Sequence, residues 1–376
     1  MDRIERNKIL YFLTKVPTLG NVRIKKIIDG VSDINNILDA DYIGNLKIDG
    51  LSLDSIKKIQ ESYNCWDEIE ESYAILLEKC EFKGISLISI VDDEYPENLR
   101  NIYDAPIFLY YKGTLKPTDK YSLSIVGTRF PSEYGESVCK QLVKEICSYN
   151  IITVSGMAKG IDSMCHKYTL QNGGCTYAVL GSGVDVVYPS ENKKLYEKII
   201  ENGAVISEFE PGAKPDKVNF PKRNRILSGI SLGTIIVETG VRGGSRITAE
   251  FALDQDRELF AVPGYIYARR SQGCNDLIKR GQAKLITCFD DVLSELSYRL
   301  EGFISSEKNI TQPATQAELS VFEQQIYNVI DDNPIHIDEI ANRTTLSISD
   351  CLVNLLTLEF KGLIKQLPGK FFRREA

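Results

Sequence analysis

Four short segments of the sequence combine glycine, hydroxyl and basic residues in a way that suits the binding of phosphate. Glycine lets a backbone approach an anion closely, and the free N–H groups at the start of a helix favour negative charge. One such segment is commonly only a turn, but four of them with basic residues indicate a phosphate-binding edge. The segments are Gly127-Thr128-Arg129, Ser155-Gly156-Met157-Ala158-Lys159-Gly160-Ile161-Asp162, Gly181-Ser182-Gly183 and Glu238-Thr239-Gly240-Val241-Arg242-Gly243-Gly244-Ser245.

A fifth segment, Phe220-Pro221-Lys222-Arg223-Asn224-Arg225, places three basic residues and an aromatic ring just before a predicted helix. Basic residues at a helix N-terminus oppose the helix dipole, so they need another reason to be there. Phosphates paired with Lys222, Arg223 and Arg225, and a base stacked on Phe220, would supply that reason. The alternative is an ordinary solvated start of a helix.

Catalytic, metal-binding and cofactor-binding patterns are weak in this sequence. No G-x-x-x-x-G-K-[ST] motif is present, and Val186 stands where the third glycine of a dinucleotide fingerprint would follow Gly181 and Gly183. The nine cysteines form no C-x-x-C pair, so we expect neither a zinc site nor disulfides but reduced thiols in the cytoplasm. The sequence therefore predicts a binding site without metal, cofactor or catalytic group.

Three further candidates for chemistry have simpler structural readings. Cys165 and His166 are adjacent in a predicted helix and point in different directions, so they do not suit a catalytic pair. Asp162 is expected to cap the helix that follows Gly160. Glu238, at the end of a predicted strand, either forms structural hydrogen bonds or acts as a catalytic carboxylate.

From residue 121 onward, short β-branched runs alternate with helical stretches, and this alternation predicts βαβ units in a parallel sheet with helices on both faces. In such a sheet, ligands bind beyond the carboxyl ends of the strands, where the glycine-rich segments lie. Two of the predicted helices are Glu133–Tyr149 and Glu191–Asn202. The predicted strands are Tyr121–Val126, Ile151–Val154, Thr176–Leu180, Ala204–Ile206, Thr234–Val237, Leu259–Val262 and Lys284–Thr287.

The 376 residues, 43% hydrophobic and 26% charged, are typical of a globular protein of several domains. No apolar run approaches the ~18–20 residues of a membrane helix, and the N-terminus lacks a leader pattern, so no membrane association is expected. We predict an α/β protein with an extended Rossmann-like parallel sheet. The predicted parts are a helical hairpin domain (1–65), the Rossmann-like core with its N-terminal extension (66–298), a polar linker (299–317) and a winged helix (318–376).

The N-terminal part shows two hairpins between short helices, of the helix-hairpin-helix or SAM-like type. Val16-Pro17-Thr18-Leu19-Gly20 separates Arg6–Leu13 from Arg23–Ile28, and Ile48-Asp49-Gly50-Leu51 leads into Leu53–Ser62. Because residues 1–120 carry 16 basic and 21 acidic side chains, packing or partner contact is favoured over DNA contact. Trp66–Cys80 follows as an amphipathic helix, and a connector around Tyr95-Pro96 leads to the sheet.

The sequence pattern of the C-terminal part predicts three helices and a two-stranded wing. The helices are Glu318–Asp331, His336–Asn342 and Ser347–Glu359, with Ser347 as an N-cap, and the wing is Leu363–Leu367 and Lys370–Arg373 around Pro368-Gly369. This part has 6 basic and 9 acidic residues, with Lys361, Lys365, Lys370, Arg373 and Arg374 crowded at the wing. Protein or regulatory contact is therefore favoured over DNA contact.

The net charge of −7 argues against nucleic acid, but phosphate affinity comes from a local patch, and residues 121–298 carry 21 basic against 20 acidic side chains. Over at least residues 84–296, the sequence closely resembles the DNA-processing protein A family (DprA, also called Smf). The motifs that carry the resemblance occur in this order: Ser124-Ile125-Val126-Gly127-Thr128-Arg129, Val154 through Asp162, Val179 through Asp185, Tyr188-Pro189, Phe220 through Ile226, Gly243 through Ala249, and Ala261-Val262-Pro263-Gly264.

The resemblance implies a bacterial cytoplasmic homodimer that is not an enzyme. It implies binding of single-stranded DNA during natural transformation, protection of that DNA and loading of the recombinase RecA. Arg246 stands where an apolar residue is common in the family. The DNA-binding residues that we expect are Gly127, Thr128, Arg129, Ser155, Gly156, Lys159, Gly181, Ser182, Gly183, Phe220, Lys222, Arg223, Arg225, Gly243, Gly244 and Ser245.

Two alternatives belong to other classes of protein. Gly243-Gly244-Ser245-Arg246-Ile247-Thr248-Ala249-Glu250 is distantly similar to the signature of nucleotide phosphoribohydrolases, with Glu250 and an arginine as catalytic residues, although one glycine of that signature is missing. A transcription regulator would use the winged helix on duplex DNA and the core as a nucleotide sensor.

Overall fold

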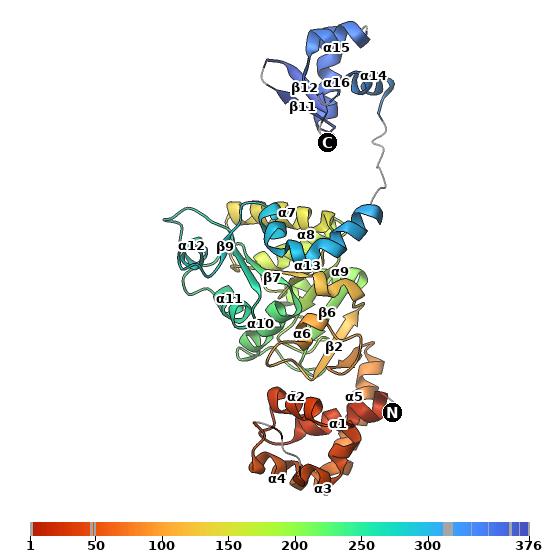
Figure 1. Ribbon diagram of the computed structural model, residues 1–376, viewed down its shortest axis with the longest axis vertical. Helices are drawn as coiled ribbons and strands as arrows, with labels where there is room; N and C mark the ends of the chain where they lie inside the picture. The colour runs from red at the N-terminus through yellow and green to blue at the C-terminus, as the bar shows by residue number, and fades with distance from the viewer. Residues whose placement is uncertain are drawn as a thin grey trace. The chain divides into compact units, whose positions relative to one another are not determined.

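The computed structural model describes residues 3–45, 48, 50–310, 319–331, 333–344, 346–360, 363–367 and 369–374. The chain forms two compact units, Met1–Glu307 and Lys308–Ala376. The first unit contains the N-terminal helices and the α/β body, and the second contains the winged helix (Figure 1).

A nine-stranded sheet forms the centre of the first unit, in the order β1-β2-β6-β5-β4-β3-β7-β8-β9. Strands β3 to β9 pair in parallel, whereas β1 and β2 are antiparallel at one edge. The predicted mostly parallel sheet is thus confirmed. The strands are β1 (Ser86–Ser89), β2 (Phe108–Gly113), β3 (Leu123–Val126), β4 (Thr153–Ser155), β5 (Thr176–Val179), β6 (Gly203–Ser207), β7 (Gly233–Ile236), β8 (Glu258–Ala261) and β9 (Lys284–Leu285).

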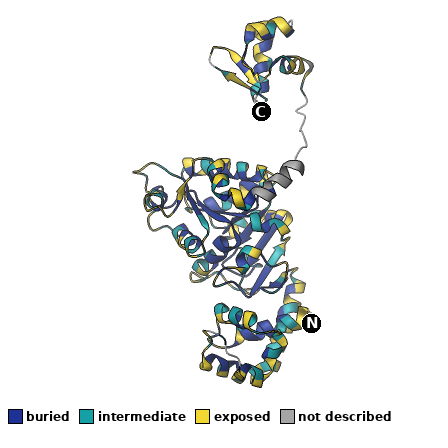
Figure 2. Cartoon of the chain, in the orientation of Figure 1, coloured by how far each residue is buried: buried dark blue, intermediate teal, exposed yellow. Residues whose placement is uncertain are grey.

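Helices cover both faces of the sheet (Figure 1). Leu123 and Ile125 of β3 pack with α7, α8 and α13, while Val126 packs on the other face with α10, α11 and α12. Because both faces are covered, the central strands are buried throughout (Figure 2), which explains their apolar runs. The helices are α7 (Glu133–Ser148), α8 (Ile161–Gln171), η4 (Ser190–Asn192), α9 (Lys193–Asn202), α10 (Asn219–Ile230), α11 (Ser245–Asp254), α12 (Gln272–Lys279) and α13 (Phe289–Ile310).

The N-terminal helices pack on the α/β body and share its hydrophobic core. The Tyr11 ring lies 6.5 Å from that of Phe108 on β2, and Lys25 donates to the carbonyls of Arg100 at 2.6 Å and Ile102 at 3.2 Å. Residues 3–65 therefore belong to the first compact unit. Asp49, in the second predicted hairpin, lies outside the described residues. The helices are α1 (Arg3–Lys15), α2 (Asn21–Gly30), η1 (Ile34–Leu38), α3 (Ala40–Asn45), α4 (Leu53–Ser62), η2 (Tyr63–Cys65) and α5 (Trp66–Phe82).

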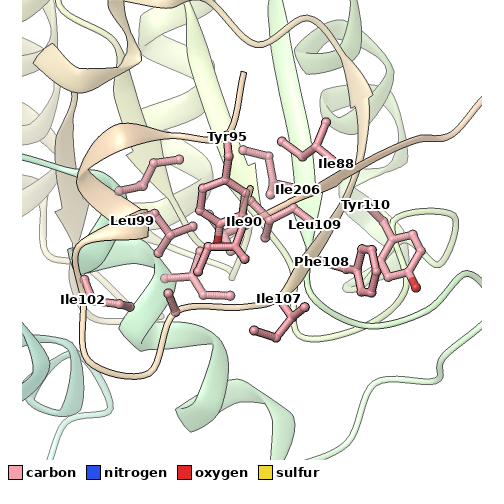
Figure 3. Close-up of a cluster of buried hydrophobic side chains, with 14 of the residues drawn as sticks. Ile88, Ile90, Tyr95, Leu99, Ile102, Ile107, Phe108, Leu109, Tyr110 and Ile206 are labelled. Atoms are coloured by element: carbon pink, nitrogen blue, oxygen red, sulfur yellow. The ribbon is translucent and has the colours of Figure 1, made fainter. Parts of the chain in front are cut away.

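The segment expected to be a connector contains β1 and β2, together with α6 (Glu97–Arg100) and η3 (Pro117–Tyr121). Figure 3 shows its buried side chains, including Ile88, Tyr95 and Leu109, gathered into one cluster. The Tyr95 hydroxyl donates to the Pro106 carbonyl at 2.7 Å. This segment extends the sheet beyond β6, because β2 pairs with β6.

The prediction of a linker from residue 299 is wrong for its first part, because α13 continues to Ile310. Leu300 and Phe303 are buried, and the Phe303 ring stacks on Tyr121 at 4.3 Å. These contacts hold the helix onto the body beyond the predicted boundary. Residues 311–317 lie outside the described residues.

The second unit confirms the predicted winged helix, with strand order β10-β12-β11. Ser347 caps α16, since its side chain accepts from the Asp350 N–H at 3.1 Å. Glu318, Lys361 and Pro368 lie outside the described residues. The elements are α14 (Val321–Val329), β10 (Ile335–His336), α15 (Ile337–Thr344), α16 (Ile348–Phe360), β11 (Ile364–Leu367) and β12 (Phe371–Arg374). Throughout the described ranges, every helix is too short or too polar to cross a lipid bilayer.

Candidate nucleic-acid interface

The predicted glycine-rich loops lie side by side at the carboxyl edge of the sheet. The Ile161 N–H donates to the Thr128 carbonyl at 3.2 Å, which joins the loop after β4 to the loop after β3. A Cβ on Gly160 would lie 2.6 Å from the Arg129 carbonyl carbon, so only glycine permits this approach. The loop after β5 contacts the start of α10, where the Phe220 ring lies 2.9 Å from the place of a Gly181 Cβ.

Three basic residues project into solvent at this edge: Arg129 and Lys159 from the loops, and Lys222 from the first turn of α10. Lys159 pairs with Glu191 at 2.7 Å, and both side chains are more than half exposed. Because an exposed ion pair contributes little free energy, a phosphate can replace Glu191 at small cost. Lys217, exposed on the approach to Phe220, is a further cation that the sequence analysis did not select.

Arg223 does not belong to this exposed set, which corrects its expected phosphate contact. Its side chain is buried, with the residue only 5% exposed. The guanidinium donates to the Gly156 carbonyl at 2.7 Å and to the Val179 carbonyl. Arg223 therefore links α10 by hydrogen bonds to the carboxyl ends of β4 and β5, and it stabilises the loops from the interior of the protein.

The expected phosphate contact of Arg225 is corrected as well, because this side chain is buried and already paired. It is 6% exposed and forms ion pairs with Glu208 at 2.6 Å and with Asp104 at 3.0 Å. Burial lowers the pKa of Arg225, but the two carboxylates outweigh burial and leave that pKa raised. With its charge already balanced, Arg225 anchors α10 to the segment before β2.

Asp162 corrects a second expectation, because Gly160 rather than Asp162 occupies the cap position of α8. The Asp162 carboxylate turns back and accepts from the backbone N–H groups of Gly156 and Ala158. Burial raises the pKa of this carboxyl to about 6, while Arg223 beside it acts in the opposite direction. An internal carboxylate thus occupies the loop in which a phosphate was expected.

Glu238 plays the same part at the start of α7 and serves as a structural acceptor. It is 2% exposed, and its carboxylate accepts from the Ser132 N–H at 2.8 Å and from the Ser132 hydroxyl at 2.5 Å. The Thr128 N–H donates to the Glu238 carbonyl at 2.7 Å. Glu238 therefore joins the loops after β3 and β7.

The predicted serines shape the loops from inside. Ser155 donates to the Ile125 carbonyl at 2.6 Å, Ser182 to the Val186 carbonyl at 2.8 Å, and Ser245 to the Thr239 hydroxyl at 2.7 Å. All three are buried, as are Gly156, Gly181 and Gly183. Ligand contact at this edge therefore falls to the exposed side chains.

The two charged residues of the hydrolase-like signature lie about one turn apart on α11. Arg246 pairs with Asp276 at 2.9 Å, and Glu250 is exposed on α11.

Cys165 and His166 are fully buried, and the His166 ring is 2.7 Å from the Thr176 hydroxyl. Burial lowers the pKa of His166 to about 3, so this imidazole is neutral in the core.

Exposed aromatic residues at the same edge were missed by the sequence analysis. Phe130 follows Arg129 and is 71% exposed, and Tyr188 lies beside Phe220 with their ring centroids 5.6 Å apart. Tyr265 and Tyr267 are exposed in the loop after β8. The available signal was the combination of aromatic and basic residues after two of the predicted strands, in Arg129-Phe130 and in Tyr265–Arg270.

Fold and edge together define a Rossmann-like α/β protein with basic and aromatic side chains at its carboxyl edge and a winged helix in a separate unit. Residues 86–297 match the family described as DNA recombination-mediator protein A, and residues 311–370 match the DprA winged helix domain. The chain belongs to the DNA recombination-mediator protein A family.

Similar proteins come from several bacteria. The DNA processing protein DprA of Streptococcus pneumoniae is 44% identical over 58% of this chain and 77% of that protein, and Protein Smf of Synechocystis is 29% identical over 96% and 97%. The X-ray structure of the S. pneumoniae protein has a TM-score of 0.63 at 37% identity, covering 77% of this chain and 97% of that one. A Helicobacter pylori DNA processing protein A, solved for its single-stranded DNA binding mode, has a TM-score of 0.52 at 28% identity, covering 57% and 96%.

Proposed function

We propose that this protein binds single-stranded DNA along the carboxyl edge of its sheet and holds the strand without breaking bonds. The observation that carries the proposal is that Arg129 and Lys159, from adjoining loops, and Lys222, from the start of α10 beside the loop after β5, project into solvent. The relative from H. pylori, which has a described single-stranded DNA binding mode, supports this ligand.

The exposed side chains would bind the strand in two ways, by charge neutralisation of phosphates and by stacking on bases. The three cations would neutralise consecutive phosphates, while Phe220 and Tyr188 would take up an unpaired base. Paired bases in a duplex have no free faces to offer these rings, so duplex DNA would bind more weakly. Asp162 and Glu238 already accept from backbone N–H groups of the loops, so side chains provide the contacts to the strand.

The wider role that we propose is in recombination of incoming DNA. Membership of the recombination-mediator family supports a protein that protects a bound strand in the cytoplasm and loads the RecA recombinase during transformation. A homodimer would place two edges on one long strand and raise affinity through effective concentration.

The winged helix would contribute by contacting protein rather than DNA. The third helix of this unit, α16, exposes Ile348, Leu352, Val353 and Leu356, which are apolar rather than basic. Deleting residues 316–376 is expected to leave the affinity for single-stranded DNA within about two-fold, measured by fluorescence anisotropy. A large loss of affinity would place α16 or the wing on the DNA.

The binding test compares single- and double-stranded oligonucleotides of one sequence at two salt concentrations. The single strand is expected to bind more tightly, with a log–log salt slope of about 0.7 for each neutralised phosphate. Equal affinity for both forms would contradict the proposal. Incubation with AMP is expected to release no free base, whereas release would favour the phosphoribohydrolase alternative.

A further inference from the structure

The loop after β8, residues 263–270 and called the β8 loop below, exposes aromatic and basic residues that the proposed site does not use. Tyr265 and Tyr267 are 70% and 74% exposed, and their ring centroids are 5.5 Å apart in an edge-to-face arrangement. Arg269 and Arg270 follow and are also exposed. Rings this exposed leave apolar area in water that a ligand would cover.

The backbone beneath these side chains is held in place by hydrogen bonds. The Asn275 side chain donates to the Gly264 carbonyl at 3.0 Å and accepts from the Gly264 N–H at 3.2 Å. The Tyr134 hydroxyl donates to the Pro263 carbonyl at 2.7 Å, and the Ala268 N–H donates to the Tyr265 carbonyl at 2.9 Å. The rings therefore project from a fixed base, which reduces the entropy that a ligand would have to remove.

The arginines of the β8 loop are available to an anion. In the part of the chain that the structure describes, neither Arg269 nor Arg270 pairs with a carboxylate. By contrast, Arg246 and Arg280 on the neighbouring helices share Asp276, each at 2.9 Å.

A further exposed arginine, Arg242, lies in the loop after β7, which the β8 loop contacts. A Cβ on Gly240 would lie 3.5 Å from the Arg269 carbonyl, and the Gly273 N–H donates to the Thr239 carbonyl at 2.8 Å. Guanidinium groups suit phosphate, and rings between them suit bases.

We infer that the β8 loop is a second stacking platform for single-stranded nucleic acid. The first platform is the pair of rings of Phe220 and Tyr188 beside the loop after β5, and strands β3 and β7 lie between the two platforms. This inference rests on the proposed function, because the same strand continues from one platform to the other. Four strand spacings separate β5 from β8, which at about 4.8 Å each is about 19 Å. Arg129 and Phe130 lie after β3, between the two platforms, so charge and aromatic surface continue along the edge.

The test uses the full chain with both tyrosines replaced, Tyr265→Ala and Tyr267→Ala. Anisotropy is measured with oligothymidylates of about 4 and about 15 nucleotides, of which only the longer one spans both platforms. The affinity for the longer oligonucleotide is expected to fall about 10- to 100-fold, while the affinity for the shorter one stays unchanged. The double variant Tyr265→Phe, Tyr267→Phe keeps the ring faces and is expected to bind like the wild type.

Tyr298→Ala is the matched control, because Tyr298 is 66% exposed and is followed by an arginine, Arg299. It lies on α13, whose Phe303 stacks on Tyr121 just before β3 begins, so it belongs to the opposite edge of the sheet. This variant is expected to bind both oligonucleotides like the wild type.

Wild-type affinity for the longer oligonucleotide in the double alanine variant would overturn the second platform while leaving the proposed function intact. An equal loss for both lengths would overturn it as well, because the tyrosines would then belong to the first platform. Failure of the proposed function would show itself differently, as unchanged binding of both lengths by Arg129→Glu.

Discussion

The guanidinium of Arg223 fills the space directly against Gly156. A Cβ added to Gly156 would lie 2.5 Å from Nη1 and 2.6 Å from Nη2 of Arg223, and 2.6 Å from the Asp162 carboxylate. The glycine of this loop is therefore required because the buried side chains of Arg223 and Asp162 leave no room for a methyl group, and this role differs from the expected close approach to a ligand.

Gly156→Ala is expected to destabilise the fold by about 1–3 kcal/mol, because the buried side chains of Arg223 and Asp162 must move to admit the methyl group. Urea unfolding measures the change. Gly244→Ala is the matched control, since no atom lies within 4 Å of its Cβ position and its backbone is already helical. Equal stability of the two variants would contradict the packing described here.

Arg129→Glu is expected to lower the affinity for single-stranded DNA by at least about ten-fold and to flatten the salt dependence, because the variant removes a phosphate contact and adds repulsion. Anisotropy titrations at several salt concentrations give both quantities. Lys144→Glu, an equal charge change on an exposed residue of α7, controls for net charge. The proposed site fails if a folded Arg129→Glu protein binds as the wild type does.

Glu238→Gln is expected to reduce stability by about 1–3 kcal/mol, because the amide replaces one of the two acceptor oxygens bonded to Ser132. Thermal unfolding detects this loss. Glu250→Gln, on the exposed side of α11, is expected to change neither stability nor DNA affinity. A loss of DNA affinity at unchanged stability in Glu238→Gln would assign that carboxylate a direct role.

Asp119 gives the fold a dependence on pH. Burial, with Glu97 nearby, raises the pKa of this carboxyl to about 7, whereas in the unfolded chain it is close to 4. The folded state therefore keeps a proton that the unfolded state releases, so this contribution to stability is complete below about pH 4 and is lost as the pH rises through 7.

Relative to Asp119→Asn, the free energy of unfolding of the wild type is expected to fall between pH 4 and 7, by at most about 4 kcal/mol for a shift of about three units. Urea unfolding of both proteins across this range measures the difference. A difference that is constant with pH would show that Asp119 ionises normally in the folded state.

The sequence predicted the parallel sheet well, because the central strands, buried on both faces, are apolar throughout, and four of the predicted strands are followed by a glycine-rich loop. It missed β1 and β2, which lie between turns. These strands join the sheet because β2 pairs with the distant β6 and β1 pairs with β2. It also ended α13 too early, since the polar composition after residue 299 concealed the buried Leu300 and Phe303.

The sequence predicted where the candidate site lies in the fold, but it did not predict which of the basic residues are exposed there. Residue type alone does not distinguish the buried Arg223 and Arg225 from the exposed Lys222, although all three lie within one turn of α10. The difference arises from partners distant in sequence, Gly156 for one arginine and Glu208 and Asp104 for the other.

Asp162 and Glu238 act as built-in substitutes for bound anions at the starts of α8 and α7. An edge that supplies its own counter-charges keeps its shape when no ligand is present, and under the proposed function its exposed side chains would provide most of the contacts to a strand. Under the proposed function, such a hold would favour rapid release of the strand to the next carrier.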